Sequence, residues 1–97
     1  MPKNMKGRLN IPDREQVGPA DTRPALAKNP AEIGMIVRKA RKESGLRQAQ
    51  AAALCGVGTR FLSDLENGKP TLHLGKVLTV LHGFGLRVII KRKEFGE

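Results

Sequence analysis

Residues 48–69 read QAQAAALCGVGTRFLSDLENGK, two short helix-like runs that meet at Gly56. Glycine tolerates the positive φ that a tight turn between two crossing helices needs. Ala52, four residues earlier, is small enough to lie where the helices touch. Apolar residues occupy the spacings that would face inward, at Ala51, Cys55, Val57, Leu62 and Leu65. The stretch therefore predicts a helix-turn-helix, with helices at about residues 48–55 and 59–66; an ordinary helical hairpin is the alternative interpretation.

The second of these helices presents a polar side to solvent once its apolar positions face inward. That side carries Gly58, Thr59, Arg60, Ser63 and Asp64. An arginine can bridge O6 and N7 of a guanine, which discriminates between bases by ~1–3 kcal/mol. Thr59 can meet a phosphate or a thymine methyl group. Asp64 accepts a hydrogen bond from cytosine N4, only orients Arg60, or is a bystander without a role in binding. This face favours DNA recognition.

The charge of the chain points the same way. Its 97 residues include 18 Lys and Arg against 9 Asp and Glu, a net charge of +9. Such a protein is attracted to nucleic acid, anionic membranes and acidic partners, and a surface tuned for solubility is the alternative reading. No apolar run approaches the ~18 residues of a membrane span, and the first residues lack the apolar segment of a signal peptide. The lone Cys55 fits a reducing compartment, so we expect a cytoplasmic bacterial protein without a membrane partner.

The rest of the chain divides into an arm, a helical domain and a tail. Residues 1–29 contain four prolines and no helical or strand period, which predicts a flexible, basic N-terminal arm. Order is expected from Asn29, an N-cap, followed by Pro30 in the first helical position and Glu32 reaching back to the cap. The apolar face of this first helix comprises Ile33, Ile36, Val37 and Ala40. Gly45 is expected to end it.

A fourth helix and a strand complete the predicted domain. Apolar residues repeat at helical spacing at Leu74, Val77, Leu78 and Leu81, with Thr71 as the expected cap and Gly83 and Gly85 at the end. LRVIIKRK, from Leu86, is β-branched and roughly alternating, which predicts a strand. A lone strand needs a partner, and a second copy of the chain is the simplest one. The sequence thus predicts an all-α helix-turn-helix domain over residues 30–85, and a dimerisation strand with a basic tail over residues 86–97.

No catalytic or metal site is expected. His73 and His82 lie nine residues apart without a ligand set at metal-binding spacing, and Ser63 has no base one turn away. The glycines near Gly56 lack the context of a phosphate-binding loop. Cys55 is interpreted as a small buried apolar residue, with a reactive thiol as the minor alternative. The sequence therefore favours a binding protein without a cofactor over an enzyme.

Several of these motifs together resemble a known family. GLRQAQAAALCGVGTRFLSDLENGKPT, followed by LHLGKVLTVLHGFGLRVII, resembles the Xre/Cro type of helix-turn-helix regulator, and within it the HipB-like antitoxins that partner HipA-type kinase toxins. The resemblance covers roughly residues 32–93. Its more specific motifs are the GLxQ opening of the second helix and the LENGK ending of the third. It implies a lambda-repressor-like domain of four to five helices whose C-terminal β-strand pairs across a homodimer.

The resemblance also implies roles for individual residues. Base edges would be read by Thr59, Arg60 and Asp64, and the DNA backbone would be contacted by Gln48, Gly58 and Ser63. Arg41 and Glu66 match a pair that ties the first helix to the third, although two solvated charges are the alternative. Removing one partner of a buried pair costs ~3–5 kcal/mol.

Three residues depart from the family pattern. Arg47 stands where the family usually has a capping Thr; it cannot cap, but it can reach a phosphate, as can Lys69. Gly58 is only a moderate N-cap for the recognition helix. Phe61 occupies a position that is more often small or polar, and it either packs against the fourth helix or touches a thymine methyl group or a sugar. These departures leave the operator sequence open.

In the family, the terminal strand pairs with its two-fold mate. Leu86, Val88 and Ile90 would then face the dimer core, with Ile89 in the same strand and the cations after it in solvent. Two recognition helices ~34–36 Å apart would read a palindromic operator in double-stranded DNA. The function predicted is an autoregulating repressor that serves as the antitoxin of a HipA-like kinase toxin. A stand-alone phage or plasmid-type repressor and a protein-binding module without DNA activity are the alternatives.

Overall fold

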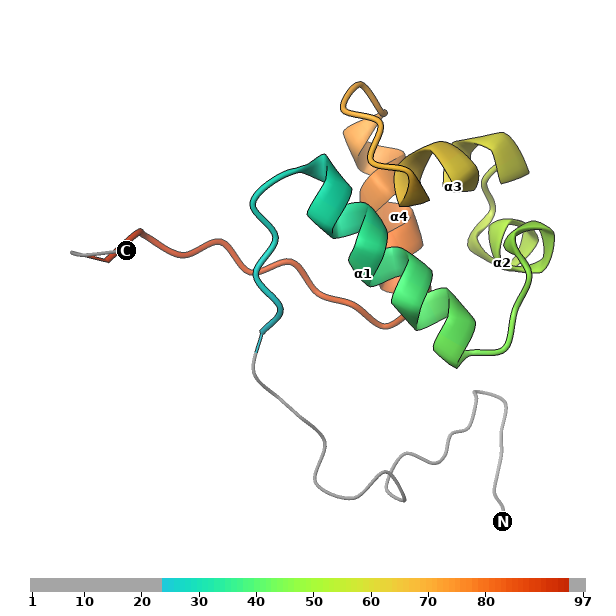
Figure 1. The fold of residues 1–97 in the computed structure, drawn as a ribbon, viewed down its shortest axis with the longest axis horizontal. Coiled ribbons are helices and arrows are strands. Elements are labelled where there is room, and N and C mark those ends of the chain that lie inside the picture. Colours follow the sequence, from blue (N-terminus) through green and yellow to red (C-terminus); the bar gives the residue numbers. More distant parts are fainter. Residues whose placement is uncertain (1–23, 95–97) are drawn as a thin grey trace, which may run out of the picture.

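The computed structural model describes residues 24–94, which form four helices and no strand. These are α1 (Pro30–Glu43), α2 (Gln48–Cys55), α3 (Thr59–Glu66) and α4 (Leu74–Gly83). α3 packs against both α1 and α2, and α4 packs against α2 (Figure 1). Most of the predicted N-terminal arm, residues 1–23, lies outside the described residues; residues 24–28 are exposed and have no regular structure.

The start of α1 follows its sequence signals with one difference. Asn29 Oδ1 accepts a hydrogen bond from the Glu32 N–H at 2.9 Å, and Pro30 occupies the first helical position. The Glu32 carboxylate was predicted to reach the N–H of Asn29, and this is wrong: it accepts from the Lys28 N–H at 2.6 Å. Asn29 is extended, with φ −159° and ψ 170°, and this conformation brings the Lys28 N–H within reach of the side chain.

The turn between α2 and α3 has the predicted geometry. Gly56 adopts φ 75°, the left-handed conformation that glycine accepts without a steric cost. Its N–H donates to the Ala53 carbonyl at 3.2 Å, and the Val57 N–H donates to the Ala52 carbonyl at 3.0 Å. The chain therefore leaves α2 and enters α3 within three residues, and the two helices pack against each other.

The core lies between the four helices and is small. Its buried apolar residues are Val37, Ala51, Ala52, Leu62, Leu65, Val77, Val80 and Leu81. Of the predicted inward positions, Cys55 and Val57 are only half-buried at the edge of this cluster. The alanines of α2 leave little side-chain volume between helices, so α3 and α4 approach α2 closely. Burying a leucine side chain stabilises the fold by ~1.5–3 kcal/mol, which makes Leu62 and Leu65 the main apolar anchors of α3.

α1 and α3 meet at Gly34, a residue that the sequence pattern did not single out. A Cβ at this position would collide with the Leu65 carbonyl oxygen and would lie 2.8 Å from that of Glu66. The backbone of α1 thus rests directly on the last turn of α3. This contact fixes where the C-terminal end of α3 lies.

The cap of α4 differs from the prediction. His73, not Thr71, is the N-cap, and its Nδ1 accepts a hydrogen bond from the Lys76 N–H at 3.3 Å. Leu72 is half-buried against the core, so the chain continues past Thr71 before the helix begins. Gly85, with φ 75°, follows the end of the helix, as expected.

The segment after α4 runs away from the helices as a single extended chain (Figure 1). Leu86 still packs on the core, and its N–H donates to the Leu81 carbonyl at 2.9 Å. The apolar residues after it are exposed, by 52% at Val88, 62% at Ile89 and 93% at Ile90. A strand is defined by a ladder of hydrogen bonds to a neighbour, and residues 86–94 form none within one chain. The pairing of this segment across a homodimer stays a prediction.

Candidate nucleic-acid interface

The exposed face of α3 collects the polar residues singled out in the sequence. Gly58, Thr59 and Arg60 are exposed, and Ser63 and Asp64 are half-exposed. Leu62, Leu65 and Glu66 are buried on the other side of the same helix. The spacing of 59, 60, 63 and 64 places the four side chains on one stripe, one turn apart. From residue 59 to residue 64 the stripe rises about 7.5 Å along the helix axis, which is less than the ~12 Å width of the DNA major groove.

Two cations on this face share one carboxylate. Arg60 Nε lies 3.7 Å from Asp64 Oδ1, and Lys69 Nζ lies 3.7 Å from Asp64 Oδ2. The Arg60 side chain is 88% exposed, that of Lys69 50%, and that of Asp64 only 25%. The guanidinium therefore projects furthest from the helix, and the carboxylate stays close to it.

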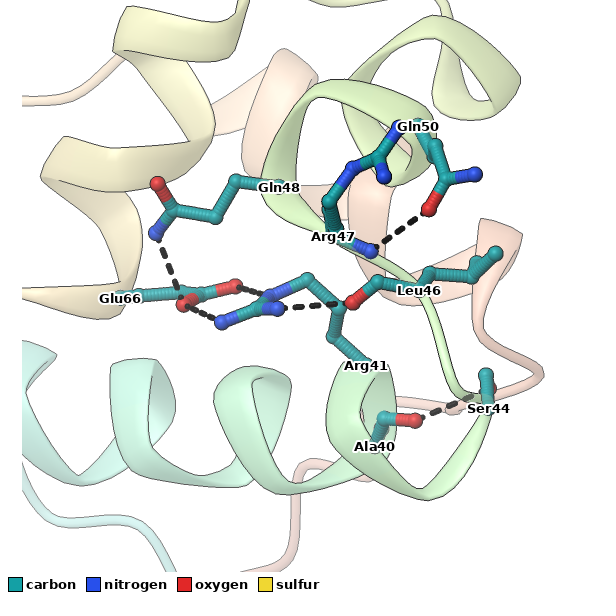
Figure 2. A network of polar contacts seen from close by, with 8 residues as sticks. All are labelled: Ala40, Arg41, Ser44, Leu46, Arg47, Gln48, Gln50 and Glu66. Carbon is teal, nitrogen blue, oxygen red and sulfur yellow. Dashed lines mark hydrogen bonds and ion pairs between the residues drawn. The ribbon is translucent and has the colours of Figure 1, made fainter.

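Behind this face, a buried ion pair joins α1 to α3 (Figure 2). Arg41 Nε donates to Glu66 Oε2 at 2.6 Å, and Arg41 Nη2 donates to Glu66 Oε1 at 2.9 Å. Arg41 Nη1 donates to the Leu46 carbonyl at 2.8 Å, so the guanidinium also holds the loop before α2. The Arg41 and Glu66 side chains are only 10% and 1% exposed.

Gln48, the first residue of α2, is attached to the same pair. Its Nε2 donates to Glu66 Oε1 at 3.0 Å (Figure 2). The resemblance assigned Gln48 to a DNA phosphate, and the structure places its amide on Glu66. An amide nitrogen carries two N–H donors, so one bond to Glu66 leaves a second for an anion. The network thus sets the position of a predicted DNA-contacting side chain.

Opposing effects act on the pKa values of this pair. Burial raises the pKa of Glu66, but hydrogen bonds from Arg41 and Gln48, with the charges of Arg41 and Arg38, outweigh burial and lower it. The hydrogen bond to Glu66 raises the pKa of Arg41, against the opposing effect of burial. Both groups are therefore charged in the folded protein, and neither is available as a proton donor near neutral pH.

Arg47 is the N-cap residue of α2, and it is exposed. Its hydrogen bond to α2 is made by its backbone. Its N–H donates to Gln50 Oε1 at 2.9 Å (Figure 2). The reciprocal half of a capping box is missing because a guanidinium has no acceptor atom. The Arg47 side chain therefore caps nothing, as the sequence predicted, and its charge lies at the N-terminus of α2.

Lys76 is a further cation near α3 that the sequence reasoning missed. Its Nζ lies 5.9 Å from the centroid of the Phe61 ring, within the range of a cation–π contact. Phe61 is half-buried and packs against the core, which fits the first of its two predicted roles. Helical spacing marks Lys76 only as a polar position of α4, so its approach to α3 had no signal in the sequence.

The remaining reactive groups of residues 24–94 form no site of their own. Within this range no group of three or more His, Cys, Asp and Glu could hold a metal ion, and no helix is both long and apolar enough to cross a membrane. Burial raises the pKa of the Cys55 thiol, which keeps it protonated. A Cβ on Gly83 would lie 2.7 Å from Cys55 Sγ, so the sulfur packs on the backbone of α4.

Comparison with known proteins identifies the segment that contains α2 and α3 as a helix-turn-helix. The model of the helix-turn-helix family matches residues 37–88, which include the whole of α2, α3 and α4. A relative from Sinorhizobium fredii (strain NBRC 101917 / NGR234), the uncharacterized HTH-type transcriptional regulator y4mF, is 54% identical over 63 residues, covering 65% of this chain and 83% of the relative.

A solved structure shares the fold. The crystal structure of the restriction-modification controller protein C.AhdI from Aeromonas hydrophila matches with a TM-score of 0.52 and 23% sequence identity, over 59% of this chain and 83% of that chain. At this identity the likeness concerns the arrangement of the helices alone. It agrees with the helical packing described above.

Proposed function

This chain belongs to the helix-turn-helix family, and from that premise we propose that it is a sequence-specific DNA-binding transcriptional repressor that acts as a homodimer. The observation that carries the proposal is the exposed stripe of α3, with a largely solvated guanidinium at Arg60 beside the exposed Thr59. A helix of this kind enters the major groove, where bases are distinguished by their donors and acceptors.

The contacts divide into those that read bases and those that hold the backbone. Arg60 would bridge a guanine, and Thr59 would meet a neighbouring base or phosphate. Backbone contacts would come from Arg47, Gln48, Gly58, Ser63 and Lys69. If a dimer makes about six to eight phosphate contacts, log K should fall against log salt with a slope of roughly −5 to −7.

The homodimer is supported by the exposed apolar residues after α4. Val88, Ile89 and Ile90 are exposed in one chain, and pairing this segment with its two-fold mate would cover them. Two copies of α3 would then read a palindrome with half-sites one helical turn apart.

The finer part of the proposal is that the repressor is the antitoxin of a HipA-like kinase toxin. Its support is the resemblance of residues 32–93 to HipB-like proteins. A kinase-like reading frame next to this gene, and copurification of its product with this chain, are the expected observations. Their absence would favour a stand-alone repressor.

The test compares Arg60, which is proposed to contact a base, with Arg47, which is proposed to contact the DNA backbone. The wild-type protein first selects duplexes from a random library, and affinities are then measured for the selected duplex and a shuffled one. Arg60→Ala should lose ~1–3 kcal/mol on the selected duplex and little on the shuffled one. Arg47→Ala should weaken both equally and make the salt slope shallower by ~0.9 for each phosphate that the variant no longer neutralises.

Lys39→Ala serves as the control, since Lys39 is an exposed cation on α1, outside the α3 stripe. It should change neither affinity nor selectivity appreciably. Unchanged selectivity in Arg60→Ala would refute the base-reading role. If the wild-type protein binds no duplex at low ionic strength, the repressor proposal fails and a protein-binding module is favoured.

A further inference from the structure

The sequence left three alternatives for Asp64: a direct contact to a cytosine, the orientation of Arg60, or no role in binding. We propose that Asp64 is a positioning residue that sets the DNA specificity of α3 by holding Arg60 and Lys69, and that it contacts no base itself. The inference rests on the proposed function, because it concerns how the same face separates one DNA sequence from others.

The first step is the way in which Asp64 holds Arg60. The contact is made by Nε of the guanidinium, 3.7 Å from Asp64 Oδ1. A guanidinium offers five N–H donors in a planar fork, and the four on Nη1 and Nη2 lie beyond Nε. Arg60 can therefore present its outer edge to O6 and N7 of a guanine while it keeps its contact to Asp64.

The second step is the low solvent exposure of the Asp64 carboxylate. The Asp64 side chain is 25% exposed, whereas that of Arg60, one turn away on the same face, is 88% exposed. The carboxylate is thus much the less accessible of the two groups, so an approaching base meets the Arg60 guanidinium more readily than Asp64. This arrangement suits a positioning residue for Arg60 better than a residue that contacts cytosine.

The third step is the double attachment of Lys69. Its backbone N–H donates to the Asp64 carbonyl oxygen at 3.0 Å, and its Nζ lies 3.7 Å from Asp64 Oδ2. Because the backbone bond fixes where the lysine starts, its ammonium is held beside the carboxylate and near the edge of α3.

These contacts penalise DNA of the wrong sequence. On such DNA Arg60 has no guanine to bridge, and it gains affinity only by turning to a phosphate. That turn breaks its pair with Asp64 and brings a phosphate towards a carboxylate that has lost one of its two cations and keeps Lys69. Exposed pairs of this kind are weak, so the expected effect is about two- to fivefold for each protomer, and about four- to 25-fold for a dimer.

The experiment uses the full chain and the duplexes selected by the wild-type protein. Wild type, Asp64→Asn and Glu43→Gln are titrated with the selected duplex and with a shuffled duplex of equal composition. Glu43 is an exposed acid on α1, so Glu43→Gln makes the same change in net charge away from α3. Far-UV circular dichroism verifies that each variant is folded.

We expect Asp64→Asn to bind the selected duplex more tightly only by the small factor that the loss of one acid gives on any DNA, and the shuffled duplex about four- to 25-fold more tightly beyond that factor, so that its selectivity falls by about four- to 25-fold. Glu43→Gln should raise both affinities by the same small factor. Asp64→Asn should also show a steeper salt slope on the shuffled duplex, since Arg60 becomes free to neutralise a phosphate.

Other results overturn the inference, and they differ from a failure of the proposed function. A loss of preference at a single cytosine, with no gain on the shuffled duplex, would show that Asp64 reads that base. Selectivity equal to that of the wild type would show that Asp64 is a bystander, while the repressor proposal stands. If the wild-type protein selects no sequence at all, both proposals fail together.

Discussion

At the scale of single residues, the buried ion pair of Arg41 and Glu66 joins α1 to α3 and also binds the Gln48 side chain at the start of α2. Arg41 and Glu66 lie 25 positions apart, and no periodicity within the chain connects them. Their pairing was expected only from the family resemblance. The attachment of Gln48 to the same carboxylate was not expected at all, because the amide was assigned to a phosphate. Spacing rules describe neighbours on one helix, whereas this network joins three elements.

Replacing Glu66 by glutamine should destabilise the fold. The substitution leaves the buried guanidinium of Arg41 without a countercharge, and we expect a loss of ~3 kcal/mol in the free energy of unfolding near neutral pH. Urea unfolding followed by far-UV circular dichroism measures it, because the chain has no Trp or Tyr to report by fluorescence.

The effect should depend on pH, with a defined sign. The pKa of Glu66 in the fold is lowered, while in the unfolded chain it is about 4.3. Its contribution is thus fully present above about pH 4.3 and is lost as the pH falls through the lower, native pKa. The gap between wild type and Glu66→Gln should shrink towards acid pH. An equal gap at neutral and acid pH would contradict this assignment.

At the scale of elements, the helices were predicted better than their contacts. The bounds of α2 and α3 follow from the apolar spacing and the turn at Gly56, both of which are local. The cap of α4 was misplaced at Thr71, because the side chain that matters is a histidine two residues later and Leu72 is drawn into the core. A preference for hydroxyl caps cannot anticipate where tertiary packing lets a helix begin.

Gly34 is a second case in which local sequence preference does not predict what tertiary packing requires. In isolation, a glycine inside a helix weakens it by ~1 kcal/mol relative to alanine. Only the fold reveals that α1 approaches α3 too closely for a Cβ at this position. A residue that propensity marks as unfavourable is therefore required by packing.

Gly34→Ala should accordingly destabilise the protein in spite of its better helix propensity. The new Cβ must push α1 away from the carbonyls of Leu65 and Glu66, at a cost of ~1–3 kcal/mol. The shift should also move the last turn of α3 and weaken binding to selected DNA. Gly75→Ala in α4 is the milder comparison: its Cβ would meet a side chain and no backbone, the exposed ring of His73, which can shift at the cost of its long cap hydrogen bond to the Lys76 N–H. If both variants are equally stable, the close crossing is not a constraint.

At the scale of the whole molecule, residues 86–94, after α4, form no regular structure and expose apolar side chains in a single copy. Residues 87–90 project from the helical body with their apolar side chains in solvent, and only Leu86 touches the core. The sequence indicated a strand because of its β-branched residues, and a strand exists only once a neighbour supplies the hydrogen bonds. Dimerisation would complete the secondary structure, add apolar burial to a small core and place two recognition helices on one duplex.

Lysine substitutions at Val88 and Ile90 should therefore separate dimerisation from folding. Both side chains are exposed in one chain, so Val88→Lys with Ile90→Lys should leave the helical content unchanged, while two cations per strand oppose pairing. Sedimentation equilibrium should give about twice 10.6 kDa for the wild type and about 10.6 kDa for the variant. Met35→Lys changes an apolar residue of α1 whose exposed fraction, 67%, lies between those of Val88 and Ile90, and this variant should stay dimeric. Without the second half-site, operator binding should weaken by ~10²–10⁴-fold, because linked sites bind with a high effective concentration. A monomeric wild type, or a variant that remains dimeric, would remove the terminal segment from the dimer interface.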